Sequence, residues 1–176
     1  MAIHAKHLRI ERWLALAVVV FLVSALDFAL GHRVAPISWG LWGKYNATSG
    51  LALKGYDPVA YFVSGKPVEG TRQFSVDWDG VRWRFADAGD RDLFLTDPQS
   101  FVPQFGGYCA LAVSKGFTAD IAPQAWVIYE QKLYLFGDAN ARAEWVATLA
   151  RGSLKSAEAN WRNRAPRSSP LWWRLL

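Results

Sequence analysis

One apolar run near the N-terminus constrains the fold of this chain more than any other feature. It reads "WLALAVVVFLVSALDFAL" from Trp13 to Leu30, and only Ser24 and Asp27 interrupt it. As a helix rising about 1.5 Å per residue, such a run spans roughly 27 Å, close to the hydrocarbon core of a bilayer. We therefore predict a transmembrane helix over residues 13–30. Asp27, near its end, would lie at headgroup depth or face a partner helix.

The flanking charge predicts the orientation of this helix. Residues 1–12 are basic, and basic residues on the short leading side favour a cytoplasmic N-terminus. We expect a single-pass protein of a bacterial inner membrane with its C-terminal domain in the periplasm. A cleaved signal peptide is the alternative, because "ALG" ending at Gly31 has small residues at a suitable spacing. The apolar run is longer than a usual signal core, which favours an uncleaved anchor.

Aromatic residues gather in two segments outside the central region. Residues 31–50 are predicted to be an interfacial linker, and residues 162–176 a basic, Trp-rich tail that ends in "LWWRLL". Trp and Tyr are typical of membrane interfaces, and Trp and Arg are also enriched at the centres of protein interfaces. The residues predicted to contact lipid or a partner are Trp39, Trp42, Trp172, Trp173 and Arg174, with Tyr45 in the same aromatic belt.

The charge distribution argues against a nucleic-acid-binding function. The formal net charge is +5, yet residues 51–150 carry twelve acidic against nine basic side chains. The excess of positive charge therefore lies at the two ends of the chain. Proteins that bind nucleic acid more often place basic residues on the folded domain.

Residues 51–161 read as a small α+β domain in which hairpins form an antiparallel sheet packed by short helices. The Asp79-Gly80 pair between two alternating segments is a strong hairpin signal. The expected elements are a hairpin of Phe74–Trp78 with Val81–Phe85, a helix capped by Asp87, a helical turn after Asp97-Pro98, a helix from Tyr108 to Lys115 closed by Gly116, a hairpin of Ala125–Tyr129 with Lys132–Phe136, and a helix capped by Asp138 that Gly152 separates from a stretch ending near Trp161.

Two motifs in this region carry a resemblance to a known family. They are "GYDPVAYF" (Gly55–Phe62) and "PQFGGYCA" (Pro103–Ala110), with "AEANW" (Ala157–Trp161) following later. Together they resemble the YHS-domain proteins, over about Leu51 to Trp161. That resemblance implies an exported or membrane-attached bacterial protein with a compact α+β domain. It also implies a metal-ligand role for the cysteine of the second motif, Cys109.

The residue types of the domain favour a different role for Cys109, the single cysteine of the chain. Transition-metal sites need several Cys, His or carboxylate ligands, and all three His lie before residue 33. A reactive thiolate needs a base or a positive neighbour. Cys109 is therefore expected to be a buried apolar residue. A metal site with Asp57 or Asp120, and a helix N-terminus that lowers the pKa of the thiol, are the alternatives.

These observations predict a non-catalytic module that docks onto a larger membrane protein complex; the location suggests a respiratory or photosynthetic one. The carboxylates lie in turns and caps, so we expect neither an acid–base pair nor an enzyme, and no cofactor. The alternative function is binding or sensing of a metal ion or small ligand. Its site would be a pocket where the two motifs meet, lined by Tyr56, Asp57, Tyr61, Tyr108 and Cys109.

Overall fold

The computed structural model describes residues 2–31, 33–37 and 43–164. The chain divides into two units, Met1–Val34 and Ala35–Leu176. The predicted contact residues Trp39, Trp42, Trp172, Trp173 and Arg174 lie outside the described residues. Mixed helix and strand, with hairpins and packed short helices, confirm the predicted α+β class.

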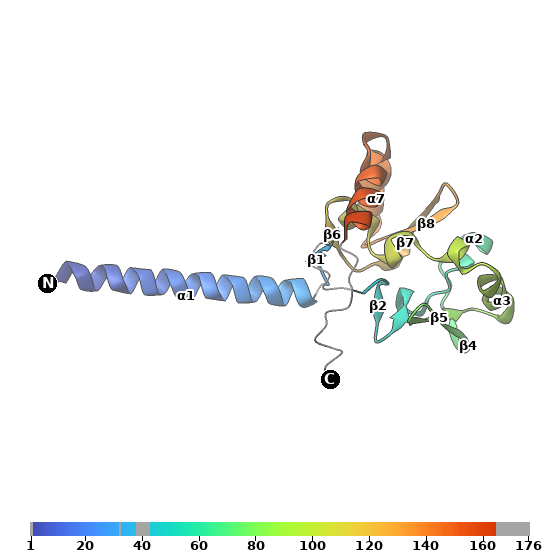
Figure 1. Ribbon diagram of the computed structural model, residues 1–176, viewed down its shortest axis with the longest axis horizontal. Coiled ribbons are helices and arrows are strands. Elements are labelled where there is room, and N and C mark those ends of the chain that lie inside the picture. The colour runs from blue at the N-terminus through green and yellow to red at the C-terminus, as the bar shows by residue number, and fades with distance from the viewer. Residues whose placement is uncertain (1, 32, 38–42, 165–176) are drawn as a thin grey trace. The chain divides into compact units, whose positions relative to one another are not determined.

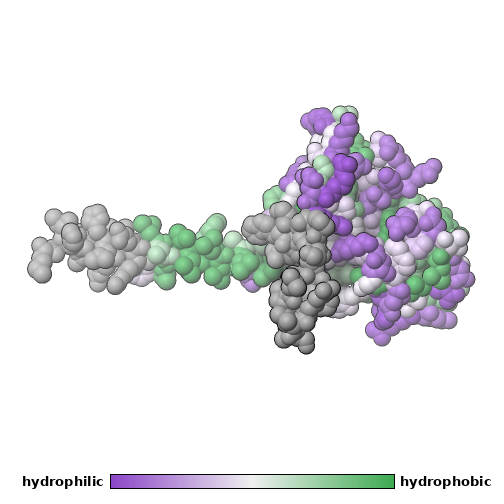
Figure 2. Space-filling model, in the orientation of Figure 1, coloured by the Kyte–Doolittle hydropathy of each residue, from purple (hydrophilic) through white to green (hydrophobic). Residues whose placement is uncertain are grey.

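The first unit is built on one helix, α1 (Ala2–Gly31). Its stretch from Trp13 to Gly31 is long and apolar enough to cross a membrane, and none of that stretch is buried. Figure 2 shows apolar side chains along it. The structure therefore supports a membrane-spanning or signal helix at the predicted position, residues 13–30.

The second unit, which we call the folded unit, begins earlier than the sequence predicts. Strand β1 (Ala35–Pro36) pairs antiparallel with β6 (Phe117–Thr118). Ile37 and Tyr45 are buried in the core. Residues before Leu51 thus belong to the fold, and Tyr45 is a core residue rather than part of an interfacial aromatic belt. Burial of its ring against Trp78 and Trp83 stabilises it there.

Four strands form the largest sheet, in the order β2-β3-β5-β4. The β4–β5 hairpin turns at Asp79-Gly80, both with positive φ, as a type I′ turn requires. The pair β3–β5 is parallel, which the sequence did not predict. The strands are β2 (Ala47–Thr48), β3 (Leu51–Ala52), β4 (Thr71–Trp78) and β5 (Val81–Phe85).

Short helices follow each hairpin. Asp87 caps α3 by accepting a hydrogen bond from the Asp90 N–H, and Asp138 caps α6 through the Ala141 N–H, both as predicted. The remaining elements are η2 (Leu53–Gly55), α2 (Ala60–Val63), α3 (Ala88–Thr96), α4 (Pro98–Phe101), η3 (Gln104–Gly107), α5 (Ala110–Ser114), β7 (Ala122–Tyr129), β8 (Lys132–Phe136), α6 (Ala139–Thr148), η4 (Leu149–Arg151) and α7 (Ser153–Asn163).

One hydrophobic core joins both halves of the folded unit, although α3 and α7 lie at different ends of it (Figure 1). Trp83 and Phe85 of β5 pack on Phe94 of α3. Tyr134 of β8 packs on Trp145 of α6, with ring centroids 4.9 Å apart. The alternation of β5 supplies its inward rings, because successive side chains of a strand point to opposite faces, whereas β8 is buried on both faces from Leu133 to Phe136.

Candidate functional site

The first predicted site residue, Asp57, is fully buried and acts as a backbone clamp. Its Oδ1 accepts hydrogen bonds from the N–H groups of Val59 (2.7 Å) and Ala60 (3.2 Å). Its Oδ2 accepts one from the N–H of Ala86, at 2.7 Å. Asp57 therefore joins the turn of the first motif to the segment between β5 and α3. Three backbone donors occupy its carboxylate.

A second carboxyl group, that of Asp90, lies against Asp57. Burial, a hydrogen bond to Asp57 and the negative charges of Asp57 and Asp87 raise the pKa of Asp90 to about 6. The sequence placed the carboxylates of this domain in turns and caps and predicted no acid–base pair. The pair depends on a long-range contact between the first motif and α3, for which the local pattern holds no signal.

The tyrosines of the first motif point to strand β7. The Tyr61 hydroxyl donates to the Pro123 carbonyl at 3.0 Å, and its ring meets Trp126 edge-on at 5.3 Å. Burial raises the pKa of Tyr61 well above its usual range. The Tyr56 hydroxyl donates to Glu69 and accepts from Gln124, at 3.1 Å in each case.

The second motif places Tyr108 and Cys109 in the core. The Tyr108 hydroxyl donates to the carbonyls of Gly43 and Tyr45. Cys109 is 4% exposed, occupies the N-cap position of α5 without a side-chain capping hydrogen bond, and forms an isolated backbone β-bridge with Leu135 of β8. Within residues 2–31, 33–37 and 43–164, no group of three His, Cys, Asp or Glu side chains could hold a metal ion.

Among the three cavities that we describe within residues 43–164, none joins the two motifs. Tyr56 and Tyr61 contact β7, whereas Tyr108 contacts the segment Gly43–Tyr45. None of the five predicted pocket residues lines any of the three cavities described below and in the further inference.

The second motif instead forms one wall of a surface cleft of about 160 Å³, which we call the aromatic cleft. The Arg164 guanidinium stacks on the Trp161 ring, 3.3 Å from its centroid. Phe105 meets the same ring edge-on, with centroids 6.0 Å apart. The lining residues are Lys44, Tyr45, Gln99, Val102, Pro103, Gln104, Phe105, Gly106, Trp161 and Arg164.

Close backbone packing explains the first of the two glycines of the second motif, Gly106. Gly106 has φ +61°, and a Cβ there would lie 2.0 Å from the carbonyl oxygen of Lys44. The Asn46 N–H donates to the Gly106 carbonyl at 2.8 Å. The loop and the segment before β2 therefore pack backbone to backbone, and only glycine fits at 106. Phe105 also has positive φ, which the sequence did not signal.

Two segments that lie outside the described residues, 38–42 and 165–176, adjoin this cleft in the sequence. Residues 38–42 attach at Gly43, next to Lys44, and the tail 165–176 attaches at Arg164. Both aromatic segments that the sequence assigns to membrane or partner contact are thus covalently joined to the rim of the aromatic cleft.

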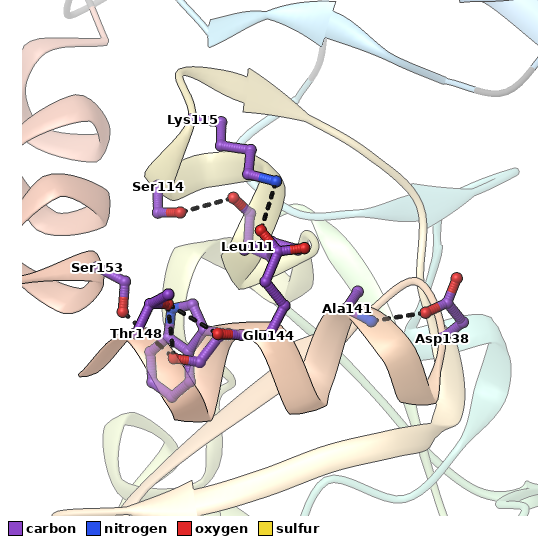
Figure 3. Close-up of polar contacts among 9 residues, drawn as sticks. Leu111, Ser114, Lys115, Asp138, Ala141, Glu144, Thr148 and Ser153 are labelled. Atoms are coloured by element: carbon purple, nitrogen blue, oxygen red, sulfur yellow. Dashed lines mark hydrogen bonds and ion pairs between the residues drawn. The ribbon is translucent and has the colours of Figure 1, made fainter. Parts of the chain in front are cut away.

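A second groove, of about 320 Å³, lies among α5, α6 and α7. Lys115 and Glu144 form an ion pair across it at 2.8 Å, and the hydroxyls of Thr148 and Ser153 both donate to the Trp145 carbonyl (Figure 3). These polar groups bind one another. They fix the packing of the three helices, and the ion pair is exposed to solvent.

Comparisons with known proteins leave the class of this chain open: no family model, no curated protein and no solved structure matches it. The resemblance to the YHS-domain proteins stays a prediction from the two motifs.

Proposed function

We propose that this protein is a membrane-anchored, non-catalytic module that docks onto a larger membrane protein assembly. In this proposal α1 is the anchor, the N-terminus is cytoplasmic and the folded unit is periplasmic. The observation that carries the proposal is the internal use of the motif side chains. Asp57, Tyr61 and Tyr108 direct their polar atoms at the backbone of the same chain. Such groups stabilise the fold; they do not present reactive atoms to a substrate.

The aromatic cleft is the docking face in this proposal. It combines the Trp161–Arg164 stack, Phe105 and Lys44, and Trp and Arg side chains carry much of the binding energy at protein interfaces. Segments 38–42 and 165–176 follow on in the sequence from Gly43 and Arg164, and in this proposal their aromatic residues contact the same partner.

Affinity purification of the full chain from membranes solubilised in mild detergent tests this function. We expect a specific integral membrane protein to co-purify in stoichiometric amount. Deletion of residues 171–176, or Arg164→Glu in the cleft, should remove it. Arg162→Glu is the matched control, because Arg162 is an exposed neighbour on α7 outside the cleft. Retention of the partner by both cleft variants would contradict the docking face, and a chain that purifies alone would contradict the function.

A further inference from the structure

A third cavity lies on the outer face of the four-stranded sheet. It encloses about 460 Å³. The alternation along β5 sends Trp83 and Phe85 into the core and Arg82 and Arg84 to this opposite face. The residues that line it are Ser49, Gly50, Leu51, Asp77, Gly80, Val81, Arg82 and Arg84.

One of the two arginines is already paired. Arg82 donates from Nε and Nη2 to the two carboxylate oxygens of Asp77, at 2.8 Å in each case. This fork keeps the pKa of Asp77 below its usual range, so the carboxylate is charged and Arg82 balances its charge. The remaining positive charge of the cavity belongs to Arg84.

Arg84 has an unmet donor. Among the residues described by the structure, no carboxylate forms an ion pair with it, and its buried Nε donates to no acceptor. Its side chain lies over Gly55, with Nη1 3.6 Å from where a Cβ of that glycine would be. A buried donor left without an acceptor is costly, and more so on a charged group. Among the residues that line the cavity, Arg84 is therefore the cation whose charge no carboxylate of the described residues balances, and its guanidinium is the group that an anion from outside would neutralise.

We propose that this cavity binds a small molecule through a carboxylate or phosphate group held by Arg84. The planar guanidinium can donate two parallel hydrogen bonds to such an oxyanion, which lysine cannot do. Leu51 and Val81 supply an apolar wall for the organic part of the ligand, and the Ser49 hydroxyl lies at the rim. This site is separate from the aromatic cleft and does not depend on the docking function.

The test uses the full chain in an uncharged detergent, titrated with inorganic phosphate or succinate at constant ionic strength. Nitrogen-resolved NMR follows the Arg84 Nε–H and the backbone amides of Gly50 and Leu51. We expect saturable shifts of these signals with at least one of the two anions. Arg84→Gln should raise the Kd by about tenfold or more, read from the backbone amides. Arg142→Gln, an exposed arginine outside the cavity, should leave the Kd unchanged.

Three outcomes would overturn the proposal. They are no saturable shift in the parent chain, an equal Kd in the Arg84→Gln variant, or shifts that occur only in nanodiscs containing phosphatidylglycerol, which would assign the oxyanion to a lipid headgroup. If Arg84→Gln does not fold, Arg84→Lys keeps the positive charge without the fork. The Nε–H signal of the parent then reports directly whether Arg84 binds the anion.

Discussion

At the scale of single residues, the polar groups of the first motif stabilise the fold through a carboxyl pair. Asp57 accepts three backbone hydrogen bonds, and Asp90 lies against it with a pKa of about 6. A carboxyl group that keeps its proton to a higher pH in the folded state than in the unfolded state destabilises the fold as the pH rises. The stability that the packing of α3 on Asp57 gives the fold should therefore fall as the pH rises toward the pKa of Asp90.

The Asp90→Asn variant should lose this pH dependence. Asn can donate to Asp57 without carrying a charge, so the destabilisation that develops between about pH 4 and pH 6 should vanish. At pH 7.5 the variant should exceed the parent in stability by at most about 3 kcal/mol, and at pH 4 the two should be similar. Thermal unfolding followed by Trp fluorescence at both pH values measures this.

Asp92→Asn is the control, because Asp92 lies on the same helix but is exposed and pairs with Arg91. Its stability difference from the parent should be small at both pH values. A parallel pH response of parent and Asp90→Asn would rule out the carboxyl pair as its source.

Gly65 and Gly106 allow the energetic cost of backbone strain to be measured apart from the cost of a steric clash. Gly106 and Gly65 both have φ +61°, but a Cβ at Gly65 would meet nothing within 4 Å. Gly65→Ala should cost about 1–2 kcal/mol from backbone strain alone. Gly106→Ala should cost at least about 3 kcal/mol, because the methyl group would overlap the Lys44 carbonyl. Equal unfolding midpoints for the two variants would show that the backbone packing at the aromatic cleft is looser than described.

At the scale of elements, both hairpins close with two residues of positive φ, yet their sequences differ. The β4–β5 turn uses Asp79-Gly80, whereas the β7–β8 turn uses Glu130 and Gln131 at φ 48° and 59°. Lys44 and Tyr45 both donate hydrogen bonds to the Asp79 carboxylate. These bonds hold the pKa of Asp79 below its usual range. The first turn is therefore locally favoured and supported by long-range contacts, and the second is formed against local preference.

Replacing Glu130-Gln131 by Asn-Gly should stabilise the protein. Asn-Gly is the preferred pair for a type I′ turn, and both side chains are exposed, so little packing is lost. We expect about 1 kcal/mol, or a rise of about 2–4 °C in Tm. The same pair introduced at Asp79-Gly80 should not stabilise, because Asn in place of Asp79 gives up the ion pair with Lys44. A lower Tm for the Glu130-Gln131 replacement would indicate an unrecognised role for these residues.

The contrast between the turns also shows what the sequence could predict. Asp79-Gly80, the caps Asp87 and Asp138 and the alternation of the first hairpin are local signals, and each predicted its element correctly. The parallel β3–β5 pair, the burial of Tyr45 and the Asp57–Asp90 contact depend on segments far apart in the chain. From the sequence, Arg84 could not be distinguished from other outward-facing strand residues. The burial of its Nε without a hydrogen-bond acceptor arises only in the folded chain.

At the scale of the whole molecule, α1 and the folded unit differ in the polarity of the surface that each exposes. Trp13–Gly31 exposes apolar side chains along its length, whereas the folded unit buries most of its large apolar residues in one core. A hydrocarbon environment therefore favours the apolar stretch of α1, and an aqueous environment favours the folded unit.

Val20→Arg combined with Val23→Arg should release the protein from membranes. Each charge near the centre of a spanning helix costs about 2.5–3.5 kcal/mol of insertion free energy. After alkaline carbonate extraction we expect the parent in the membrane pellet and the double variant largely in the supernatant. Val63→Arg, at an exposed apolar position of the folded unit, should stay with the pellet. A double variant that still resists extraction would show that α1 is not what holds the chain in the membrane.

The burial of Cys109 has a consequence for the life of the molecule in an oxidising compartment. A folded copy keeps its lone sulfur out of reach, so neighbouring copies stay independent. A copy that unfolds exposes that sulfur, and because the chain has no second cysteine, a disulfide between copies can form only between two molecules. Disulfide-linked dimers would therefore report that copies of the chain had unfolded in that compartment.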